Sequence, residues 1–218
     1  PRVKEPYTVA KIIHYTLLHH VNAKQMNIDT PVRELGHVDI DQLREVLLNE
    51  EQPAWDLTTL RQEEFEVHKT TKSIVMIFAD IEQWPTIEIR KEEGWDILAK
   101  VALPIMNEII QSNYNPGGTV IRAIAAKLLP GENIASHWDS HPSFLCGHRI
   151  HLPIKTNSRV RFNIDGLPYQ FNVGEAYEIN NQKTHSVINK GAEERIHFIF
   201  DYVPLSELEK LPAILEQN

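Results

Sequence analysis

The segment IASHWDSHPSFLCGHRIHLPI, residues 134–154, contains side chains that can bind a metal ion. His137 and Asp139 are separated by one residue, so on a β-strand they would lie on the same face, with Trp138 on the other. An imidazole beside a carboxylate provides two metal ligands, and a third must come from another strand. His185, in NNQKTHSVIN, is the best candidate because it begins an expected strand after a turn-like NNQK.

Two histidines and one carboxylate form the ligand set of non-haem Fe(II) oxygenases, which leaves three coordination positions open for co-substrate and oxygen. Ten residues after His185, beyond the hairpin NKGAEE, lies Arg195, and an antiparallel return would place it beside the strand of His185. A guanidinium there can bind a carboxylate bidentately. Arg149 and His151 alternate in the same way and add two donors on one strand face. A dicarboxylic acid bound to the metal at one end and to an arginine at the other would suit this set.

The second half of the chain has the pattern of an antiparallel β-structure. After the turn signal NPGG, short segments alternate apolar and polar residues and are rich in β-branched and aromatic side chains. The predicted strands are Thr119–Leu128, Ile134–Trp138, Arg149–Ile154, Arg159–Ile164, Tyr169–Asn172, Ala176–Ile179, Ser186–Asn189 and Arg195–Val203. Short strands at such spacing are typical of a barrel or a sandwich.

The first half is predicted to be mainly helical. Apolar residues recur at helical spacing in Thr8–His20, in HVDIDQLREVLLNEE and in GWDILAKVALPIMNEIIQSNY. The second of these helices is expected to be capped by Asp39 or Asp41, and Pro104 either kinks the third helix or divides it in two. A buried strand, Lys72–Asp80, is expected among them, and the tail PLSELEKLPAILEQ is predicted to be a terminal helix.

Length and composition indicate one globular domain. The chain has 218 residues, of which 42% are hydrophobic and 24% are charged. Within a single domain over 1–218 we expect a mainly helical flank with some strand over 1–115, a β-structured core over 116–203 and a terminal helix over 204–218.

Charge and hydropathy make nucleic acid and membrane unexpected partners. The formal net charge is −8, and no cluster of lysines and arginines stands ready to neutralise phosphates. No apolar run approaches the roughly 20 residues that a membrane helix needs. The opening PRVKEPYTVAK lacks the apolar core of a secretory signal. Because the chain begins at Pro1 and not at a methionine, a leader peptide removed before Pro1 stays an open alternative. A single cysteine, Cys146, excludes an internal disulfide, which fits a reducing compartment, so a cytoplasmic location is expected.

Three motifs carry a resemblance to a known family. HWDSHPSFLCGHRIHLPI, NVGEAYEINNQKTHSVIN and ERIHFIFDYV resemble the aspartyl/asparaginyl β-hydroxylase family of Fe(II)- and 2-oxoglutarate-dependent oxygenases. The resemblance covers about Thr119–Val203 and implies a double-stranded β-helix of the cupin or jelly-roll type. The expected fold class is therefore α+β, mainly β: such a barrel flanked by N-terminal helices and a C-terminal helix.

The resemblance also implies roles for the residues of the metal cluster. It implies that His137, Asp139 and His185 hold the iron and form the catalytic centre. Some relatives lack the carboxylate ligand, and related halogenating enzymes leave that position to halide. Asp139 therefore favours hydroxylation.

Further roles concern the co-substrate. The resemblance implies that Arg195 binds the distal carboxylate of 2-oxoglutarate, and that Arg149 and His151 match an R-x-H pair near the other end of the co-substrate and the substrate. Some relatives have a serine that helps the arginine. The strand RAIAAKLLPG has alanines instead, so any helper must be another residue.

The chain is thus predicted to hydroxylate an unactivated C–H bond of an amino-acid side chain, either free, in a small peptide-like molecule or within a protein, using O2. Two alternatives stay open. A cupin metalloenzyme that does not use 2-oxoglutarate is disfavoured by Arg195, and a catalytically inactive cupin that only binds ligands is disfavoured by the complete set of ligands. The sequence indicates neither the substrate nor the oligomeric state.

Several neighbouring residues are expected to have structural roles only. His141 and His148 are expected to face water from a loop, and His197 to be a core histidine with its hydrogen bonds satisfied. Asn180 and Asn181 are expected to shape the turn before His185, because asparagine tolerates left-handed backbone.

Overall fold

The computed structural model of the chain describes residues 28–49, 55, 71–80, 88–115, 117–139, 144 and 147–205. The predicted helix Thr8–His20, almost all of the predicted terminal helix, His141 and Cys146 lie outside the described residues.

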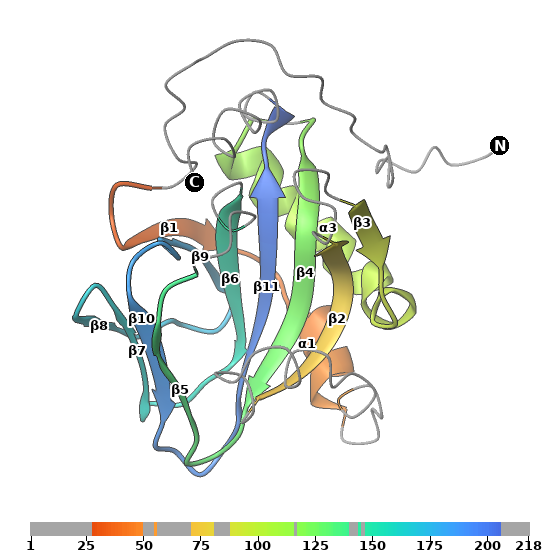
Figure 1. The fold of residues 1–218 in the computed structure, drawn as a ribbon. Helices are drawn as coiled ribbons and strands as arrows, with labels where there is room; N and C mark the ends of the chain where they lie inside the picture. The colour runs from red at the N-terminus through yellow and green to blue at the C-terminus, as the bar shows by residue number, and fades with distance from the viewer. Residues whose placement is uncertain are drawn as a thin grey trace, which may run out of the picture.

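Two antiparallel sheets make up most of the described structure (Figure 1). The major sheet has seven strands in the order β1-β9-β6-β11-β4-β2-β3, and the minor sheet has four in the order β5-β10-β7-β8. The strands are β1 Val32–His37, β2 Thr71–Asp80, β3 Glu88–Lys91, β4 Thr119–Leu128, β5 Asn133–His137, β6 His148–Lys155, β7 Val160–Ile164, β8 Leu167–Tyr169, β9 Glu175–Ile179, β10 His185–Asn189 and β11 Arg195–Val203. The two sheets face each other, which confirms the predicted jelly-roll fold class.

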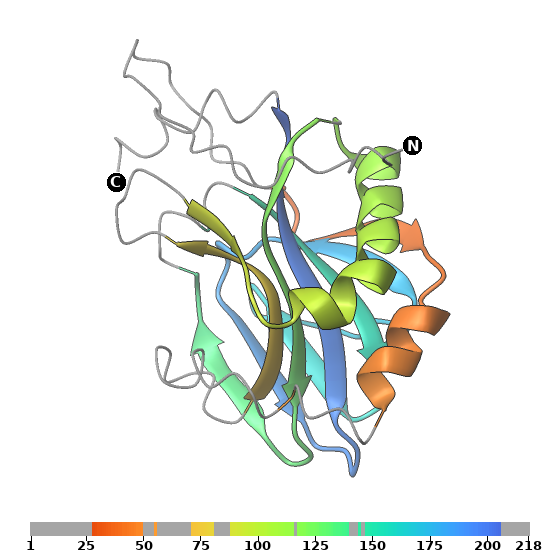
Figure 2. The same cartoon turned by 90° about the vertical axis from the view of Figure 1, so that its right-hand side faces the viewer.

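In the described part of the chain, two helices cover the outer face of the major sheet (Figure 2). They are α1, Asp41–Leu48, and α3, Trp95–Asn113, and both were predicted. The prediction that Asp39 or Asp41 is the N-cap of α1 is wrong, because Ile40 occupies that position. The Asp39 carboxylate still accepts the backbone N–H of Asp41 at 3.0 Å. Pro104 lies inside α3 without dividing it, and the helix bends along its length. No helix in the described part of the chain combines the length and apolar character needed to cross a membrane.

The alternation of side chains along the major sheet separates two apolar cores. On β11, Phe198 and Phe200 point toward the helices and join the larger core beneath α1 and α3. The second core lies between the sheets and consists of Leu128, Val160, Phe162, Ile164, Phe171, Tyr177, Ile179 and Val187. Residues of β11 that alternate with the phenylalanines face this space, and Arg195 is among them.

Three strand predictions differ from the structure. The edge strands β1 and β3 were not predicted, because an edge strand exposes much of its surface and shows little apolar alternation. The strand predicted at Tyr169–Asn172 lies earlier, as β8 at Leu167–Tyr169.

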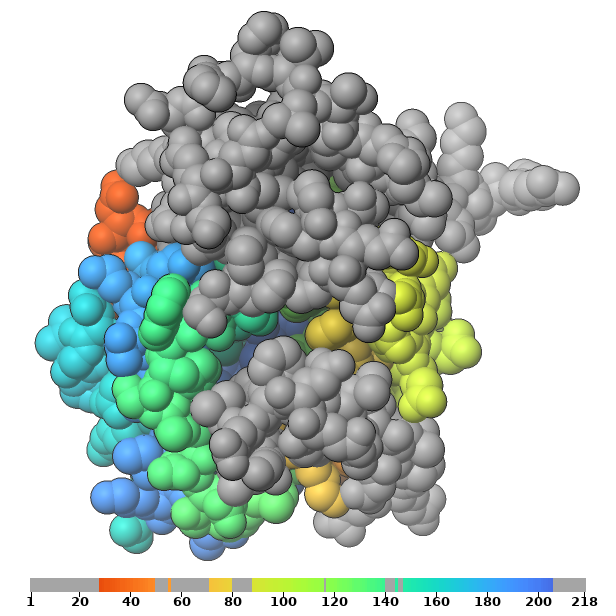
Figure 3. All heavy atoms as spheres, in the orientation of Figure 1, coloured from red at the N-terminus to blue at the C-terminus, as the bar shows by residue number. Residues whose placement is uncertain are grey.

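Space-filling spheres show β5 with its neighbours of the minor sheet on the left and β3 on the far right (Figure 3).

The core between α3 and the major sheet gives a test of the fold. Leu98 is 0% exposed on α3, whereas Leu167 on β8 is 56% exposed. We expect Leu98→Ala to lower the free energy of unfolding by about 2–5 kcal/mol through lost burial and a cavity, and Leu167→Ala to change it by less than about 0.5 kcal/mol. Urea denaturation measures both values. Equal costs for the two variants would contradict the assignment of this core.

Candidate metal centre

The pairing of β5 with β10 brings three possible metal ligands together. His137 is the last residue of β5 and His185 is the first of β10, and the two are direct partners across the ladder. Asp139 follows β5 by two residues. One ligand atom from each of these three side chains lies within 4.8 Å of the others. The side chain of Trp138, between two of them in sequence, is 57% exposed, as strand alternation predicts.

Both imidazoles place the same nitrogen, Nδ1, against a backbone carbonyl oxygen. Nδ1 of His137 lies 2.8 Å from the carbonyl oxygen of Ala135, and Nδ1 of His185 lies 2.9 Å from that of Lys183. A carbonyl oxygen can only accept, so each Nδ1 carries the proton and each Nε2 keeps its lone pair. Burial lowers the pKa of His185 although Asp139 opposes the shift, which favours the neutral imidazole that metals bind.

A turn over residues 180–184 fixes Asp139 beside His185. The side-chain oxygen of Asn180 accepts the backbone N–H of Gln182 at 3.1 Å, and its carbonyl accepts that of Lys183 at 3.1 Å. The carbonyl of Asn181 accepts the backbone N–H of Asp139 at 3.2 Å. The two asparagines therefore shape this turn, as expected from the sequence.

Arg195 is a buried cation that faces the minor sheet. Arg195 is 2% exposed, and its guanidinium carbon lies 5.6 Å from the ring centre of Phe162. In the part of the chain that the structure describes, it contacts no carboxylate, and its Nε has no hydrogen-bond partner. Burial lowers the pKa of Arg195 to about 9. A buried charge without a counter-ion is costly, so this position fits an anionic ligand.

Phe162 connects Arg195 with the metal cluster. The ring of His185 stacks on it with 6.3 Å between ring centres and 23° between the planes. The prediction that an antiparallel return places Arg195 beside the strand of His185 is wrong. The two strands do not pair, because β10 belongs to the minor sheet and β11 to the major sheet. The hairpin between them crosses from one sheet to the other, so the two residues approach across the interior instead.

His197 sets the orientation of Arg195. Its Nδ1 accepts a hydrogen bond from Nη2 of Arg195 at 2.6 Å, because a guanidinium can only donate. The same Nδ1 lies 3.3 Å from Nδ1 of His151. Burial, with the charge of Arg195, lowers the pKa of His197 well below its usual value and keeps it neutral. His197 is therefore a core histidine with hydrogen bonds, as expected, and it links His151 to Arg195.

Arg149 contacts carboxylates of the chain itself. Its Nε and Nη2 donate to the two oxygens of Asp201, each at 2.9 Å, and its Nη1 donates to Oδ2 of Asp139. Arg122 also donates to Asp201, at 3.3 Å. Burial opposes ionisation of Asp201, but the two arginines outweigh it and lower its pKa.

The sequence reasoning missed Asp201 and Arg122. The signal was present, because Asp201 follows Arg195 and His197 with an even spacing on β11 and so shares their face. His148 was wrongly expected to face water. It begins β6, and its Nδ1 lies 2.6 Å from Oε1 of the buried Glu178, on the opposite face of the sheet from Arg149.

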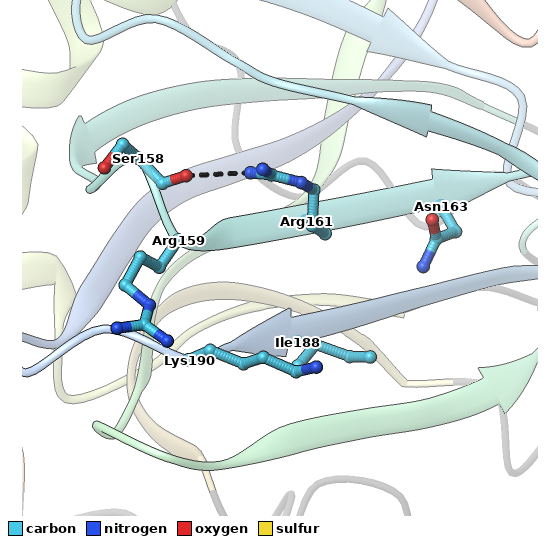
Figure 4. Close-up of a pocket in the computed structure, with 6 residues that line it drawn as sticks. All are labelled: Ser158, Arg159, Arg161, Asn163, Ile188 and Lys190. Carbon is cyan, nitrogen blue, oxygen red and sulfur yellow. Dashed lines mark hydrogen bonds between the residues drawn. The ribbon is translucent and has the colours of Figure 1, made fainter.

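The outer face of the minor sheet carries a separate hollow of about 320 Å³ (Figure 4). The residues that line it are Ser158, Arg159, Arg161, Asn163, Ile188 and Lys190. Arg161 donates to the carbonyl oxygen of Ser158 at 2.8 Å and is exposed. This hollow contains none of the residues of the metal cluster.

Solved structures with similar folds share little sequence with this chain. A non-heme monooxygenase, solved as the ThoJ-Ni complex, has a TM-score of 0.50 at 12% identity, covering 80% of this chain and 74% of that one. An oxidoreductase of the 2OG-Fe(II) oxygenase family from Burkholderia pseudomallei has a TM-score of 0.48 at 12% identity, covering 62% and 69%. A prolyl-4-hydroxylase from Pseudomonas putida has a TM-score of 0.47 at 12% identity, covering 81% and 94%. No curated protein matches the sequence.

The family comparison covers most of the chain. The family model described as Aspartyl/Asparaginyl beta-hydroxylase matches residues 39–204, a range that includes the three candidate ligands and Arg195. The chain belongs to the aspartyl/asparaginyl β-hydroxylase family and is an oxygenase of the hydroxylase type.

Proposed function

We propose that this chain is an Fe(II)- and 2-oxoglutarate-dependent dioxygenase that hydroxylates an unactivated C–H bond of an amino-acid side chain. The substrate is a free amino acid, a small peptide-like molecule or a residue within a protein. One observation carries the proposal: a cluster of two histidines and one carboxylate shares the space between the sheets with a buried guanidinium that has no carboxylate partner among the described residues.

The donor set of the cluster fits ferrous iron. Two imidazole Nε2 atoms, from His137 and His185, and one carboxylate, from Asp139, are the ligands of the non-haem Fe(II) oxygenases. Iron bound there supplies the oxidative chemistry of the C–H hydroxylation together with O2 and the co-substrate. The protein contributes fixed ligands, orientation of the reactants and exclusion of water.

The surroundings of Arg195 fit the distal end of 2-oxoglutarate. A carboxylate at the guanidinium would neutralise the buried charge and could accept from the unpartnered Nε. Aromatic rings lie nearby: Phe162 and Phe171 are 5.2 Å apart between ring centres, and Phe171 lies 6.1 Å from the ring of His197. These rings offer an apolar wall for the methylene carbons of the diacid.

The choice of an amino-acid side chain as substrate is supported by the family to which the chain belongs. The direct test incubates the purified protein with Fe(II), 2-oxoglutarate, ascorbate and a panel of free amino acids, their acylated forms and short peptides. We expect one substrate to gain one oxygen atom by mass spectrometry, with an equal amount of succinate. Bound iron without succinate across the whole panel would favour a cupin enzyme that does not use 2-oxoglutarate.

The three candidate ligands can be tested without turnover. We expect His137→Ala and His185→Ala to abolish binding of Co(II), a redox-stable probe, because each removes one of three protein ligands. Trp138→Ala is the matched control, since this exposed side chain lies between two ligands in sequence and points away. Isothermal titration calorimetry measures the affinities. Wild-type affinity in both histidine variants would refute the ligand assignment, and a wild-type protein that binds no metal would support an inactive binding module.

Arg195 can be tested on co-substrate binding. In the Mn(II)-loaded protein we expect Arg195→Met to weaken 2-oxoglutarate binding by about 10- to 150-fold, because a bidentate charge-assisted contact is worth about 1.5–3 kcal/mol. Arg161→Met removes an arginine from the outer face of the minor sheet and should leave the affinity unchanged. Equal affinities of Arg195→Met and the wild type would assign the diacid to another cation.

The charge of Arg195, which has no carboxylate partner among the described residues, also predicts a cost to stability. Because burial lowers its pKa to about 9, the folded protein binds this proton less tightly than the unfolded chain does, so the penalty is complete below that pH and declines progressively as pH rises above it. We expect Arg195→Met to raise the free energy of unfolding of the ligand-free protein at pH 7 by about 1–4 kcal/mol. The gain should shrink above pH about 9 in urea denaturation. A less stable variant at pH 7 would contradict the unpaired charge.

A further inference from the structure

We propose that Arg149 and Asp201 form a clamp that holds the second oxygen of Asp139, so that this carboxylate presents only Oδ1 to the metal. These two residues, called here the Asp139 clamp, are positioning residues, since neither is one of the candidate ligands. The inference rests on the proposed function, because it concerns the same metal centre.

The clamp is built into one row of the major sheet. Arg149 on β6 and Asp201 on β11 are direct partners across the ladder, and Arg122 on β4 is the partner of Asp201 on its other side. The three side chains therefore project from neighbouring strands toward the same interior space. The ring of Phe144 lies against both guanidiniums, with its centre 4.4 Å from that of Arg122 and 4.6 Å from that of Arg149.

The planar guanidinium transmits the position of Asp201 to Asp139. Asp201 takes the edge of Arg149 formed by Nε and Nη2, with both hydrogen bonds at 2.9 Å. A bidentate pair fixes the plane of the guanidinium, and the remaining Nη1 then points at Oδ2 of Asp139. A lysine at this position could keep the charge but could not make three contacts in one plane.

The two oxygens of Asp139 consequently face different partners. Oδ2 accepts from Arg149, while Oδ1 lies 3.8 Å from Nε2 of His137, on the side of the imidazole ligands. Three protein ligand atoms leave three positions on an octahedral ion for co-substrate and oxygen. A carboxylate that bound through both oxygens would occupy one of these positions, and the clamp prevents this.

The buried Asp201 also balances charge. It is 2% exposed and lies between two arginines. When Asp139 binds a metal ion, the cation compensates its negative charge, and Asp201 remains as the counter-ion of Arg149. Without Asp201, the charges of Arg122 and Arg149 would repel the incoming cation. Arg149 could then also turn an edge with two N–H donors toward Asp139.

Co(II) binding tests the clamp. We expect Asp201→Asn to weaken Co(II) binding by about 10- to 100-fold, the usual effect of removing a partner of a ligand. We expect Arg149→Lys, which retains the charge, to change the visible absorption spectrum of bound Co(II), because Asp139 can then bind through both oxygens. Circular dichroism monitors the fold, and should Asp201→Asn not fold, the spectrum of Arg149→Lys decides.

Glu178→Gln is the matched control. Glu178 is a buried carboxylate that pairs with Arg33 and His148 on the opposite face of the major sheet. This variant should keep the Co(II) affinity and spectrum of the wild type even where its stability falls. A wild-type Co(II) spectrum in Arg149→Lys would overturn the clamp. Failure of the wild-type protein itself to bind Co(II) would instead overturn the proposed function, so the two failures are distinguishable.

Discussion

The register of β10 against β5 is the constraint on which the metal centre depends. His137 and His185 are partners in that ladder, and their rings lie 4.3 Å apart between centres. A slip of one residue would turn one of the imidazoles to the other face of the sheet and separate the ligands. The apolar face of Val187 and its neighbours in the core between the sheets opposes such a slip, since the slip would expose them. Packing of the barrel therefore maintains the geometry of the site.

Two arginines that face the space between the sheets, Arg149 partly buried and Arg195 buried, have opposite electrostatic situations. Arg149 is neutralised by Asp201 and Asp139, which raises its pKa although burial opposes the shift, whereas burial alone lowers the pKa of Arg195. A guanidinium whose charge is balanced by carboxylates can orient a ligand of the metal. A guanidinium that lacks a carboxylate partner among the described residues can attract an anion. The same residue type thus serves two purposes, and the neighbouring carboxylates decide which.

Much of this site could be predicted from the sequence because strand alternation determines which side chains share a face. That rule identified His137 with Asp139, and the hairpin spacing identified Arg195 as a nearby cation. Alternation does not say which sheet a strand joins, so the position of Arg195 opposite β10 rather than beside it came only from the structure. The pairing of Arg149 with Asp201 was missed for a related reason, since partners on β6 and β11 lie 52 residues apart in sequence. Polar edge strands such as β1 lack the alternation that reveals a strand.

A crystal structure of the protein with Mn(II) and 2-oxoglutarate, obtained without oxygen, tests the central claim most directly. The account predicts an Mn(II) ion, located by its anomalous density, that is bound by Nε2 of His137, Nε2 of His185 and Oδ1 of Asp139. It also predicts the distal carboxylate of the diacid on the guanidinium of Arg195. Metal bound elsewhere, or a diacid whose distal carboxylate lies away from Arg195, would contradict it.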